Sequence, residues 1–424
     1  TVFAGALVFR TLLPDTFGSP DNAFWIGAFL TVILTGVYTV LGGLRAVAYT
    51  EVAQTGLLLL GSAFITYFGL EALGGWDELG TLAAQNREGF ALWRPLSDPE
   101  FPWLGILIAS PVIGIWYWCT DQYIVQRTLA AKDLTNARRG AIWGGFLKVW
   151  PVLVFLVPGL IGWALHQKGL LAIPPKADGS GIDGDMVFPL MVTQLLPVGL
   201  RGLVVAGLLS ALMSSLASMF NSCATLFTVD IYEKLRPGRP ERELVTVGRI
   251  ATGVVVTFGI IWIPVMHSMA GGGLYRYLQG VQSYLAPPIT AVFLLGLLTT
   301  RVNAVGALSG LLSGFVLGMS KLTVEAIHAS RPFVDGSLLY EFASFNFLYY
   351  SGILVFLSSL IVIAVSLITA PPDVERISGL TFRSLTVDDR AEIRASWSRV
   401  DVLATLVVLG LVAGFSVYST FWLR

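Results

Sequence analysis

The sequence predicts an all-α polytopic membrane protein, and three observations support this. The 424 residues are 55% hydrophobic and only 13% charged, and the mean hydropathy is +0.74. Such values lie far from those of soluble domains. Ten segments of roughly 20 mainly apolar residues have the length that crosses a bilayer as a helix. We therefore expect a multi-pass protein of the cell membrane, with the lipid bilayer as its partner.

The predicted spans follow one another along almost the whole chain. They are 24–44, 47–70, 103–124, 141–165, 200–227, 246–266, 275–298, 305–324, 347–367 and 402–422. Residues 1–13 have the composition of the end of an earlier span. The chain starts with Thr and has no signal peptide, so we expect it to be truncated at its amino end.

Charge and cysteine content exclude several classes of function. The 27 basic and 27 acidic residues cancel, which leaves no basic surface for nucleic acid. Cys119 and Cys223 both lie in apolar spans, so neither a disulfide framework nor a metal site is implied. The chain has no zinc-protease motif, phosphate-binding loop or dinucleotide fingerprint. We do not expect an enzyme.

Loop charge predicts the orientation in the membrane. Loops 127–139 and 230–249 are rich in Lys and Arg and belong in the cytoplasm. Loops 71–100 and 168–185 lean acidic and alternate with the basic ones, so they face outside. Loop 371–398 is then a cytoplasmic, solvated linker, and the carboxyl terminus is outside.

A polar seam runs through the apolar span 200–227. Four serines recur every fourth residue, and a helix places them on one face: Ser210, Ser214, Ser218 and Ser222. Ser215 and Ala211 repeat the spacing one step around the helix. Hydroxyl and carbonyl oxygens are the ligands that hard cations prefer, and lipid offers none. Alternatively, small residues allow close helix packing and each hydroxyl bonds back to its own helix.

Aromatic and polar residues mix at the end of span 103–124. On a helix, Trp118 and Gln122 share one face, as do Tyr117 and Asp121, with Gly114 one turn earlier. Flat rings beside amide and carboxylate groups suit a polyhydroxylated ring, which places Tyr117, Trp118 and Gln122 among the candidate solute-binding residues. An interfacial aromatic belt is the alternative.

Two charged residues stand inside or at the edge of a span. Lys148 lies about two turns into span 141–165, where it faces the bundle interior or snorkels to the interface. Glu51 opens span 47–70 and is either an interfacial carboxylate or a cation ligand.

A double proline interrupts span 275–298. Pro287 and Pro288 remove backbone donors, so we expect a broken helix with free carbonyls, as in the sites of secondary transporters. Gln279 stands near the start of this span. Without further support it would be an ordinary interface residue.

Four motifs resemble the sodium/glucose cotransporter (solute:sodium symporter) family. They are Trp-Tyr-Trp-Cys-Thr-Asp-Gln at 116–122 with Val-Gln-Arg at 125–127, Ala-Leu-Met-Ser-Ser-Leu at 211–216 continuing to 232, Gly-Gly-Leu at 42–44 with Tyr-Thr-Glu at 49–51, and Gln279 with Ser-Tyr-Leu-Ala-Pro-Pro at 283–288. They occur in family order between about residues 37 and 300. The charged loop and final span resemble those of bacterial members.

The resemblance implies a bundle of two inverted five-helix repeats, the LeuT-like fold, with solute and sodium bound near mid-membrane. The chain would begin inside the third core helix, so the first core helices are missing. We expect one transmembrane domain, 1–424. Residues 1–70 would be the remainder of the first repeat and 103–298 the second repeat. Residues 299–424 would add helices, with a cytoplasmic loop at about 371–398.

The resemblance also implies roles for individual residues. Ala211 would give a backbone carbonyl, and Ser214 and Ser215 their hydroxyls, to a sodium ion. Tyr117 matches the aromatic gate that closes the sugar toward the cytoplasm. The positions that contact sugar are matched by Trp118, Lys148 and Gln279.

At two points the chain departs from the family pattern. Glu51 and Ser218 match positions linked to a second sodium ion in some members, but the family usually has Asp where this chain has Glu51. That difference weakens the case for a second ion. Gly114 stands where relatives carry Thr or Asn, which leaves the identity of the sugar open.

The sequence therefore predicts sodium-coupled secondary active symport of a sugar into the cell, with the sodium ion as the coupling ion. The solute would be a hexose such as glucose or galactose, or a polyol such as inositol. Two alternatives stay open. The same scaffold could carry another small organic solute, or the protein could be a sugar-gated ion conductor or sensor without net transport.

Overall fold

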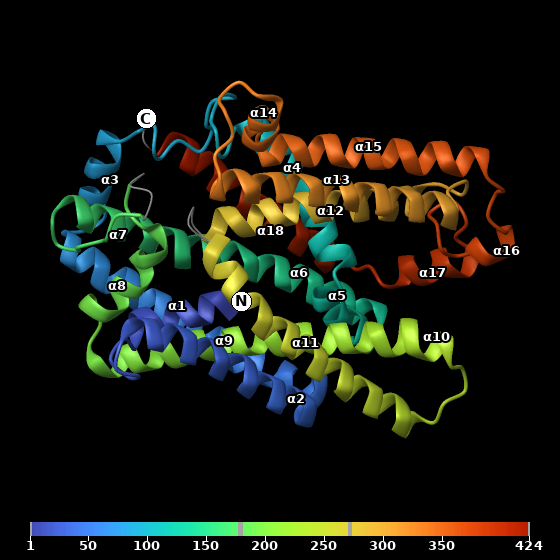
Figure 1. The fold of residues 1–424 in the computed structure, drawn as a ribbon, viewed down its shortest axis with the longest axis horizontal. Coiled ribbons are helices and arrows are strands. Elements are labelled where there is room, and N and C mark those ends of the chain that lie inside the picture. Colours follow the sequence, from blue (N-terminus) through green and yellow to red (C-terminus); the bar gives the residue numbers. More distant parts are fainter. Residues whose placement is uncertain (1, 177–180, 270–273, 423–424) are drawn as a thin grey trace. The chain divides into compact units, whose positions relative to one another are not determined.

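The computed structural model describes residues 2–176, 181–269 and 274–422 (Figure 1), without the side chains of 38, 41–51, 53, 152–153, 265–269 and 274. Within this part of the chain the regular structure is helical, apart from one isolated bridge between Pro175 and Ile182. Ten helical segments there are long and apolar enough to cross a membrane, and each overlaps one predicted span. The all-α polytopic prediction is confirmed.

The helices divide into two compact units, each built from two stretches of chain. The first unit comprises Thr1–Asn86 and Lys148–Leu274, and the second Arg87–Leu147 and Tyr275–Arg424. The first holds α1 Val2–Leu12, α2 Pro20–Leu73, α3 Trp76–Gln85, η2 Val152–Leu156, α7 Val157–Gln167, η3 Gly184–Met186, α8 Val187–Leu195, α9 Val198–Thr225, η4 Leu226–Tyr232, α10 Glu233–Leu235 and α11 Glu241–Met269. The second holds α4 Trp103–Ile115, η1 Trp116–Thr120, α5 Gln122–Leu129, most of α6 Leu134–Pro151, α12 Leu274–Leu298, α13 Ala304–Ser330, α14 Leu338–Ser344, α15 Phe347–Ile368, α16 Val374–Ile377, α17 Val387–Ala395 and α18 Arg399–Phe421.

Helix α2 joins two predicted spans into one helix of 54 residues. The sequence predicts a separation near Arg45, but residues 37–53 contain no proline, so nothing removes a backbone donor there. At 1.5 Å per residue α2 is roughly 80 Å long, more than twice the thickness of a hydrocarbon core. Its two apolar stretches, Pro20–Val37 and Gln54–Leu73, correspond to the two predicted spans.

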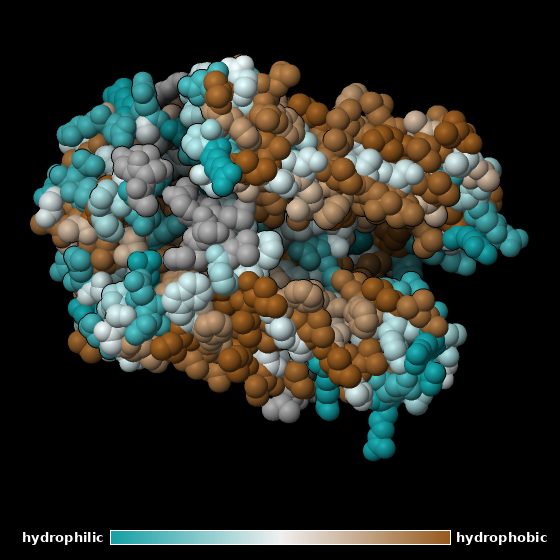
Figure 2. Space-filling model, in the orientation of Figure 1, coloured by the Kyte–Doolittle hydropathy of each residue, from teal (hydrophilic) through white to brown (hydrophobic). Residues whose placement is uncertain are grey.

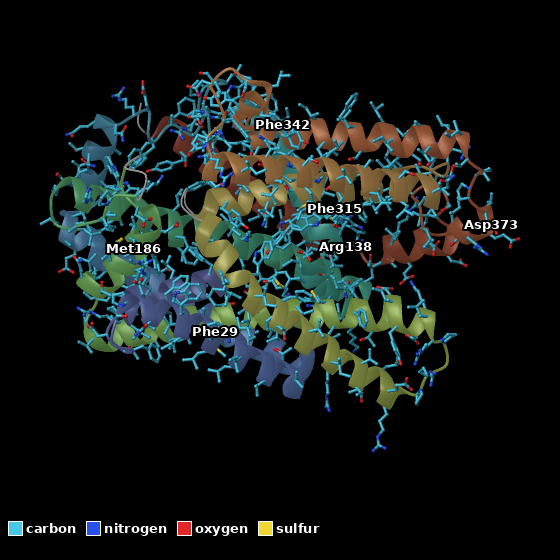
Figure 3. All side chains as sticks on the ribbon, viewed as in Figure 1. Phe29, Arg138, Met186, Phe315, Phe342 and Asp373 are labelled. Carbon is cyan, nitrogen blue, oxygen red and sulfur yellow. The ribbon has the colours of Figure 1, made fainter. Side chains whose placement is uncertain are left out.

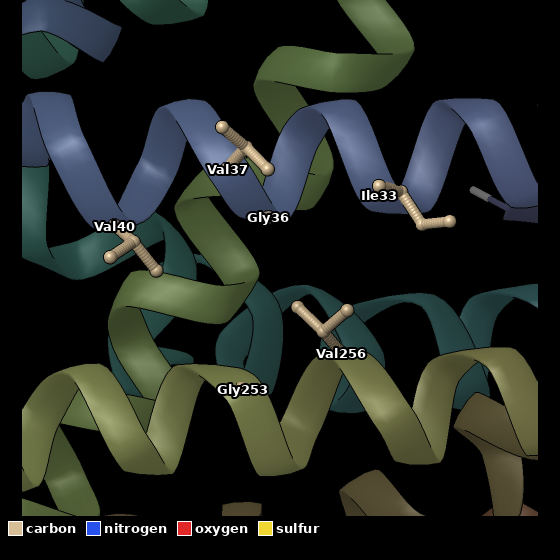
Figure 4. Close-up of a pocket in the computed structure, with 6 residues that line it drawn as sticks. All are labelled: Ile33, Gly36, Val37, Val40, Gly253 and Val256. Carbon is tan, nitrogen blue, oxygen red and sulfur yellow. The ribbon is translucent and has the colours of Figure 1, made fainter.

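The core of the first unit forms where α1, α2, α9 and α11 pack together. Val32 of α2 packs with Leu216 and Phe220 of α9 in one buried cluster. A shallow groove of about 360 Å³ between α2 and α11 is lined by aliphatic residues and glycines (Figure 4): Ile33, Gly36, Val37, Val40, Gly253 and Val256. Because this lining offers no polar side chain, the groove does not suit a sugar or an ion.

A glycine stripe on α13 organises the second unit. Its four glycines are buried and recur every fourth residue: Gly306, Gly310, Gly314 and Gly318. They lie against Ser366 and Val362 of α15 and against Pro288 and Tyr284 of α12. Small residues at this spacing let membrane helices approach closely. The outer sides of α13 and α15 are covered by apolar side chains, and polar ones gather beyond, at α16 (Figure 2).

Helix α12 runs without a break through the double proline, so the predicted break is wrong. Proline has the φ value of a helix, and only the donors toward the carbonyls of Ser283 and Tyr284 are lost. The Tyr284 carbonyl lies against Gly318 of α13, where a Cβ atom would collide with it. Close contact with α13 therefore supports α12 at the residues that the prolines leave without backbone bonds.

The predicted cytoplasmic linker 371–398 is folded onto α6 rather than free. Arg138 of α6 donates to Ser396 Oγ at 2.6 Å and lies 4.2 Å from the ring of Trp397. The next residue, Arg139, pairs with the buried carboxylate of Asp401 at 3.0 Å. Two consecutive arginines thus hold the junction between α17 and α18.

Candidate functional site

The serine seam lies on one buried face of α9, as the spacing predicts. Ser214, Ser218 and Ser222 expose 3%, 0% and 4% of their surface. At the next position of the seam, Gln54 Nε2 of α2 donates to Ser210 Oγ at 2.7 Å. The seam therefore includes a polar contact between α2 and α9 inside the apolar first unit.

The hydroxyls of this segment do not all have the same surroundings. Ser222 Oγ donates to the Ser218 carbonyl at 2.8 Å, which is the back-bonded arrangement of a packing residue. Half-buried Ser215 has no hydrogen bond from its hydroxyl within the described part of the chain. Ser215 Oγ is therefore an oxygen that an ion can use without displacing a protein partner.

Three candidate ion ligands come from this single helix. Because α9 is unbroken from Val198 to Thr225, the Ala211 carbonyl bonds within the helix and offers an ion only its second lone pair. Ser214 and Ser215 add hydroxyls at the next turn. Hard cations take about six oxygens, so this set is one part of a full coordination shell. Among the described residues no cluster of His, Cys, Asp and Glu suits a transition metal.

The aromatic segment departs from the single helix that the sequence predicts. After Ile115 the backbone forms one π-helical turn, η1, in which Asp121 N donates to Trp116 O at 3.0 Å. Asp121 is then extended (ψ 113°) and caps α5 by accepting from Tyr123 N. The regular α-helix on which the pairs of residues four apart were placed therefore does not continue through Asp121. π-Helical turns within helices often mark functional sites.

The break presents the aromatic side chains unequally. Trp118 is 50% exposed, Tyr117 is half-buried, and their rings meet edge to face at 5.2 Å. Gln122 becomes the first residue of α5. A broken helix does occur in this chain, but it lies at Asp121 rather than at the double proline.

Gln279 lies on α12, which runs parallel to α4. Phe101 faces Tyr275 with ring centroids 6.1 Å apart, and Thr290 Oγ1 donates to Val112 O at 2.8 Å. Interpolated between these contacts, Gln279 lies near the level of Gly105, about three helical turns before Tyr117. The half-buried amide of Gln279 makes no hydrogen bond to the described chain.

The remaining predicted residues have different outcomes. Lys148 is exposed on α6 and belongs to the first unit, as do the α9 residues, whereas Tyr117, Trp118, Gln122 and Gln279 belong to the second. A Cβ atom on Gly114 would meet nothing within 4 Å, so a side chain such as Thr or Asn would have room there. The side chain of Glu51 lies outside the described residues.

One polar cluster was not predicted. Lys321 of α13 has a fully buried side chain and pairs with Glu325 at 3.0 Å, and Tyr284 donates to the same carboxylate. The signal was present in the sequence, because Lys321 and Glu325 are four residues apart at the end of an apolar span.

Comparison with known proteins identifies the family. The model of the sodium:solute symporter family matches residues 2–314. A sodium/mannose cotransporter of Bos taurus is 36% identical over 89% of this chain and 68% of its own. The sodium/glucose cotransporter 4 of Danio rerio is 34% identical over 94% and 63%, and the sodium/myo-inositol cotransporter 2 of Homo sapiens 38% identical over 82% and 55%. The chain thus spans roughly half to two thirds of the length of these relatives.

A solved structure has the same fold. A Na⁺-coupled sialic acid symporter in a substrate-bound, outward-open state superposes with a TM-score of 0.63 at 22% identity. The match covers 88% of this chain and 72% of that one, and it confirms the predicted LeuT-like fold class. The described residues hold ten helices long and apolar enough to cross a membrane, and the family model matches most of the chain. The chain belongs to the sodium:solute symporter family.

Proposed function

We propose that this protein carries a sugar or polyol into the cell by sodium-coupled secondary active symport. The observation that supports this most is the half-buried Ser215 hydroxyl, which has no described protein partner on a helix where Ser222 is back-bonded. A seam of this kind suits a dehydrated monovalent cation. Relatives named for glucose, mannose and myo-inositol supply the solute class.

The proposed mechanism assigns one ligand to each set of residues. Sodium binds at Ala211, Ser214 and Ser215. Gln279 is assigned to the solute, as are Trp118 and Gln122 with Tyr117 on their cytoplasmic side, about three helical turns further along α4. Lys148, which belongs to the other unit, is a separate candidate contact. A second ion at Ser218 and Glu51 would require Glu51 to take the role of the Asp that the family usually has at this position. Coupling requires each ligand to bind better when the other is bound, typically by about 1–3 kcal/mol. Membrane voltage adds about 2.3 kcal/mol per charge per 100 mV if the ion crosses the full field.

Uptake by reconstituted vesicles tests this function. The full-length protein is placed in liposomes with a sodium gradient and offered glucose, galactose, mannose and myo-inositol. We expect accumulation of at least one solute above its external concentration. Current evoked by a sugar without accumulation would instead support the conductor or sensor alternative.

Gln279→Ala tests the solute site. Because the Gln279 amide has no described protein partner, its removal costs the fold little and deprives the solute of a hydrogen bond. Losing such a bond costs about 0.5–1.5 kcal/mol, so we expect solute affinity to fall by roughly 2- to 13-fold while sodium binding stays measurable. Unchanged solute affinity would remove α12 from the site.

One observation favours a different solute on the same scaffold. Gly114 has no side chain, and nothing lies within 4 Å of a Cβ atom built on it, so this position gives a solute no side-chain hydrogen bond. The family resemblance implies Thr or Asn there. If sugars fail to compete with uptake of the true solute, the carboxylate, amino acid or other polyol alternative gains.

A further inference from the structure

The most unusual group in the second unit is the ammonium of Lys321. Its side chain is fully buried on α13. Nζ donates to the carbonyls of Phe342 at 2.5 Å and Ala343 at 2.9 Å, and it pairs with Glu325 Oε1 at 3.0 Å. A lysine ammonium has three donors, and here each one has an oxygen acceptor.

The two carbonyls belong to the end of a short helix. Phe342 and Ala343 lie in the last turn of α14, where helix carbonyls have no partner within the helix. A cation at this end also satisfies the helix dipole. Lys321 thus caps α14, the short helix between α13 and α15 on which Phe342 lies (Figure 3).

Glu325 extends the cluster to a third helix. The phenol of Tyr284, on α12, donates to Glu325 Oε1. Tyr284 is fully buried, and its ring packs edge to face on Tyr350 of α15 at 5.7 Å. The Lys321–Glu325–Tyr284 network therefore joins α12, α13 and α14.

The network meets α12 where that helix has lost backbone bonds. The carbonyls of Ser283 and Tyr284 lack the donors that Pro287 and Pro288 cannot provide. Gln279 lies on the same helix, just over one turn before Tyr284. Ionisable residues inside membrane spans are costly and usually functional, and an apolar trio would pack these helices at less cost.

We propose that Lys321, Glu325 and Tyr284 are positioning residues that hold the Gln279-bearing half of α12 against α13 and α14. The proposal rests on the proposed function, since Gln279 is assigned there to the solute. In this arrangement the network sets the affinity for solute and leaves the maximal rate of the transport cycle unchanged.

Two tyrosines provide a matched test. Tyr284→Phe removes the hydroxyl that links α12 to Glu325. Tyr350→Phe removes a hydroxyl from the same aromatic cluster, but that hydroxyl donates to Leu317 O of α13 at 3.0 Å and does not touch α12. For the Tyr284 variant we expect KM for solute to rise about fivefold with the maximal rate within about twofold, and for the Tyr350 variant no change in KM.

Lysine variants separate charge from packing. Lys321→Arg keeps a cation with several donors, so KM should stay within about twofold of the wild-type value, whereas Lys321→Met should raise KM at least as much as Tyr284→Phe. Equal KM shifts in both tyrosine variants, or no shift in either, would overturn the positioning role even if sodium-driven uptake is established.

A second readout does not depend on transport. Ala343 is 7% exposed and takes part in the network only through its carbonyl, so Ala343→Cys keeps the network. The thiol of the Ala343→Cys variant is labelled with a membrane-permeable maleimide, and labelling at position 343 is followed by mass spectrometry. We expect this labelling to be several times faster when Lys321→Met is added, and no faster when Tyr350→Phe is added. Equal labelling would refute the tether at α14. If no solute is transported at all, the proposed function fails while labelling still decides the tether.

Discussion

At the scale of single residues, Ser215 and Ser222 allow a controlled comparison on one helix. Ser222 already donates to Ser218 O, whereas Ser215 has no described partner. We expect Ser215→Ala to raise the sodium concentration for half-maximal uptake by about tenfold, or about 1.4 kcal/mol. Ser222→Ala should leave it unchanged. Equal sodium dependence in both variants would remove Ser215 from the ion site.

Lys148 allows a second comparison. If its ammonium contacts the solute, Lys148→Met removes a charged hydrogen bond, and solute affinity should fall by about 10- to 100-fold. Lys132→Met, in an exposed loop, is the control and should have no effect. Uptake at the wild-type rate and affinity by the Lys148 variant would support the interfacial, snorkelling interpretation instead.

Residue spacing predicted some of the candidate site and missed the rest. The four-residue repeat from Ser210 to Ser222 was sufficient to predict one shared, buried face, because α9 is a regular helix. The regular helix expected through Tyr117 and Asp121 was wrong because spacing alone does not show a π-helical turn. Lys321 and Glu325 carry a signal in their four-residue spacing, but the bonds from Lys321 to the carbonyls of Phe342 and Ala343 could not be predicted, because backbone carbonyls leave no pattern in the sequence.

At the scale of helices, the contact between α12 and α13 is the feature most sensitive to volume. A Cβ atom on Gly318 would collide with the Tyr284 carbonyl. We expect Gly318→Ala to destabilise the protein by about 1–3 kcal/mol, as overpacking does. Gly296→Ala, on the exposed side of α12 with nothing within 4 Å, is the control. Thermal unfolding in detergent is the measurement, and we expect the midpoint temperature of unfolding to be lower for the Gly318 variant only.

Helix positions were predicted better than helix breaks. All ten apolar spans were found because length and hydropathy are local properties of the sequence. The break at Asp121 and the continuity at Pro287 were not predicted. The break is local, because the Asp121 carboxylate accepts from Tyr123 N and caps α5, but residue spacing does not show it. The continuity at Pro287 depends on the distant contact with Gly318 of α13. The separation expected near Arg45 was wrong for a simpler reason, because residues 37–53 contain no helix-breaking proline.

At the scale of the whole molecule, family and fold class agree with the sequence prediction. The four motifs that carried the resemblance lie between about residues 37 and 300, inside the stretch 2–314 that the family model matches. The division into a partial first repeat, a second repeat and added helices stays a prediction. The bacterial type and the truncated amino end also stay predictions.

Cation dependence tests the central claim most directly. Liposomes containing the full-length protein are given the same inward gradient of sodium, potassium or choline, and accumulation of solute is measured at fixed membrane voltage. We predict accumulation above equilibrium with sodium only, and its loss when the sodium gradient is abolished. Equal accumulation with potassium replacing sodium would contradict the proposal that the α9 oxygens bind sodium and couple its entry to the solute.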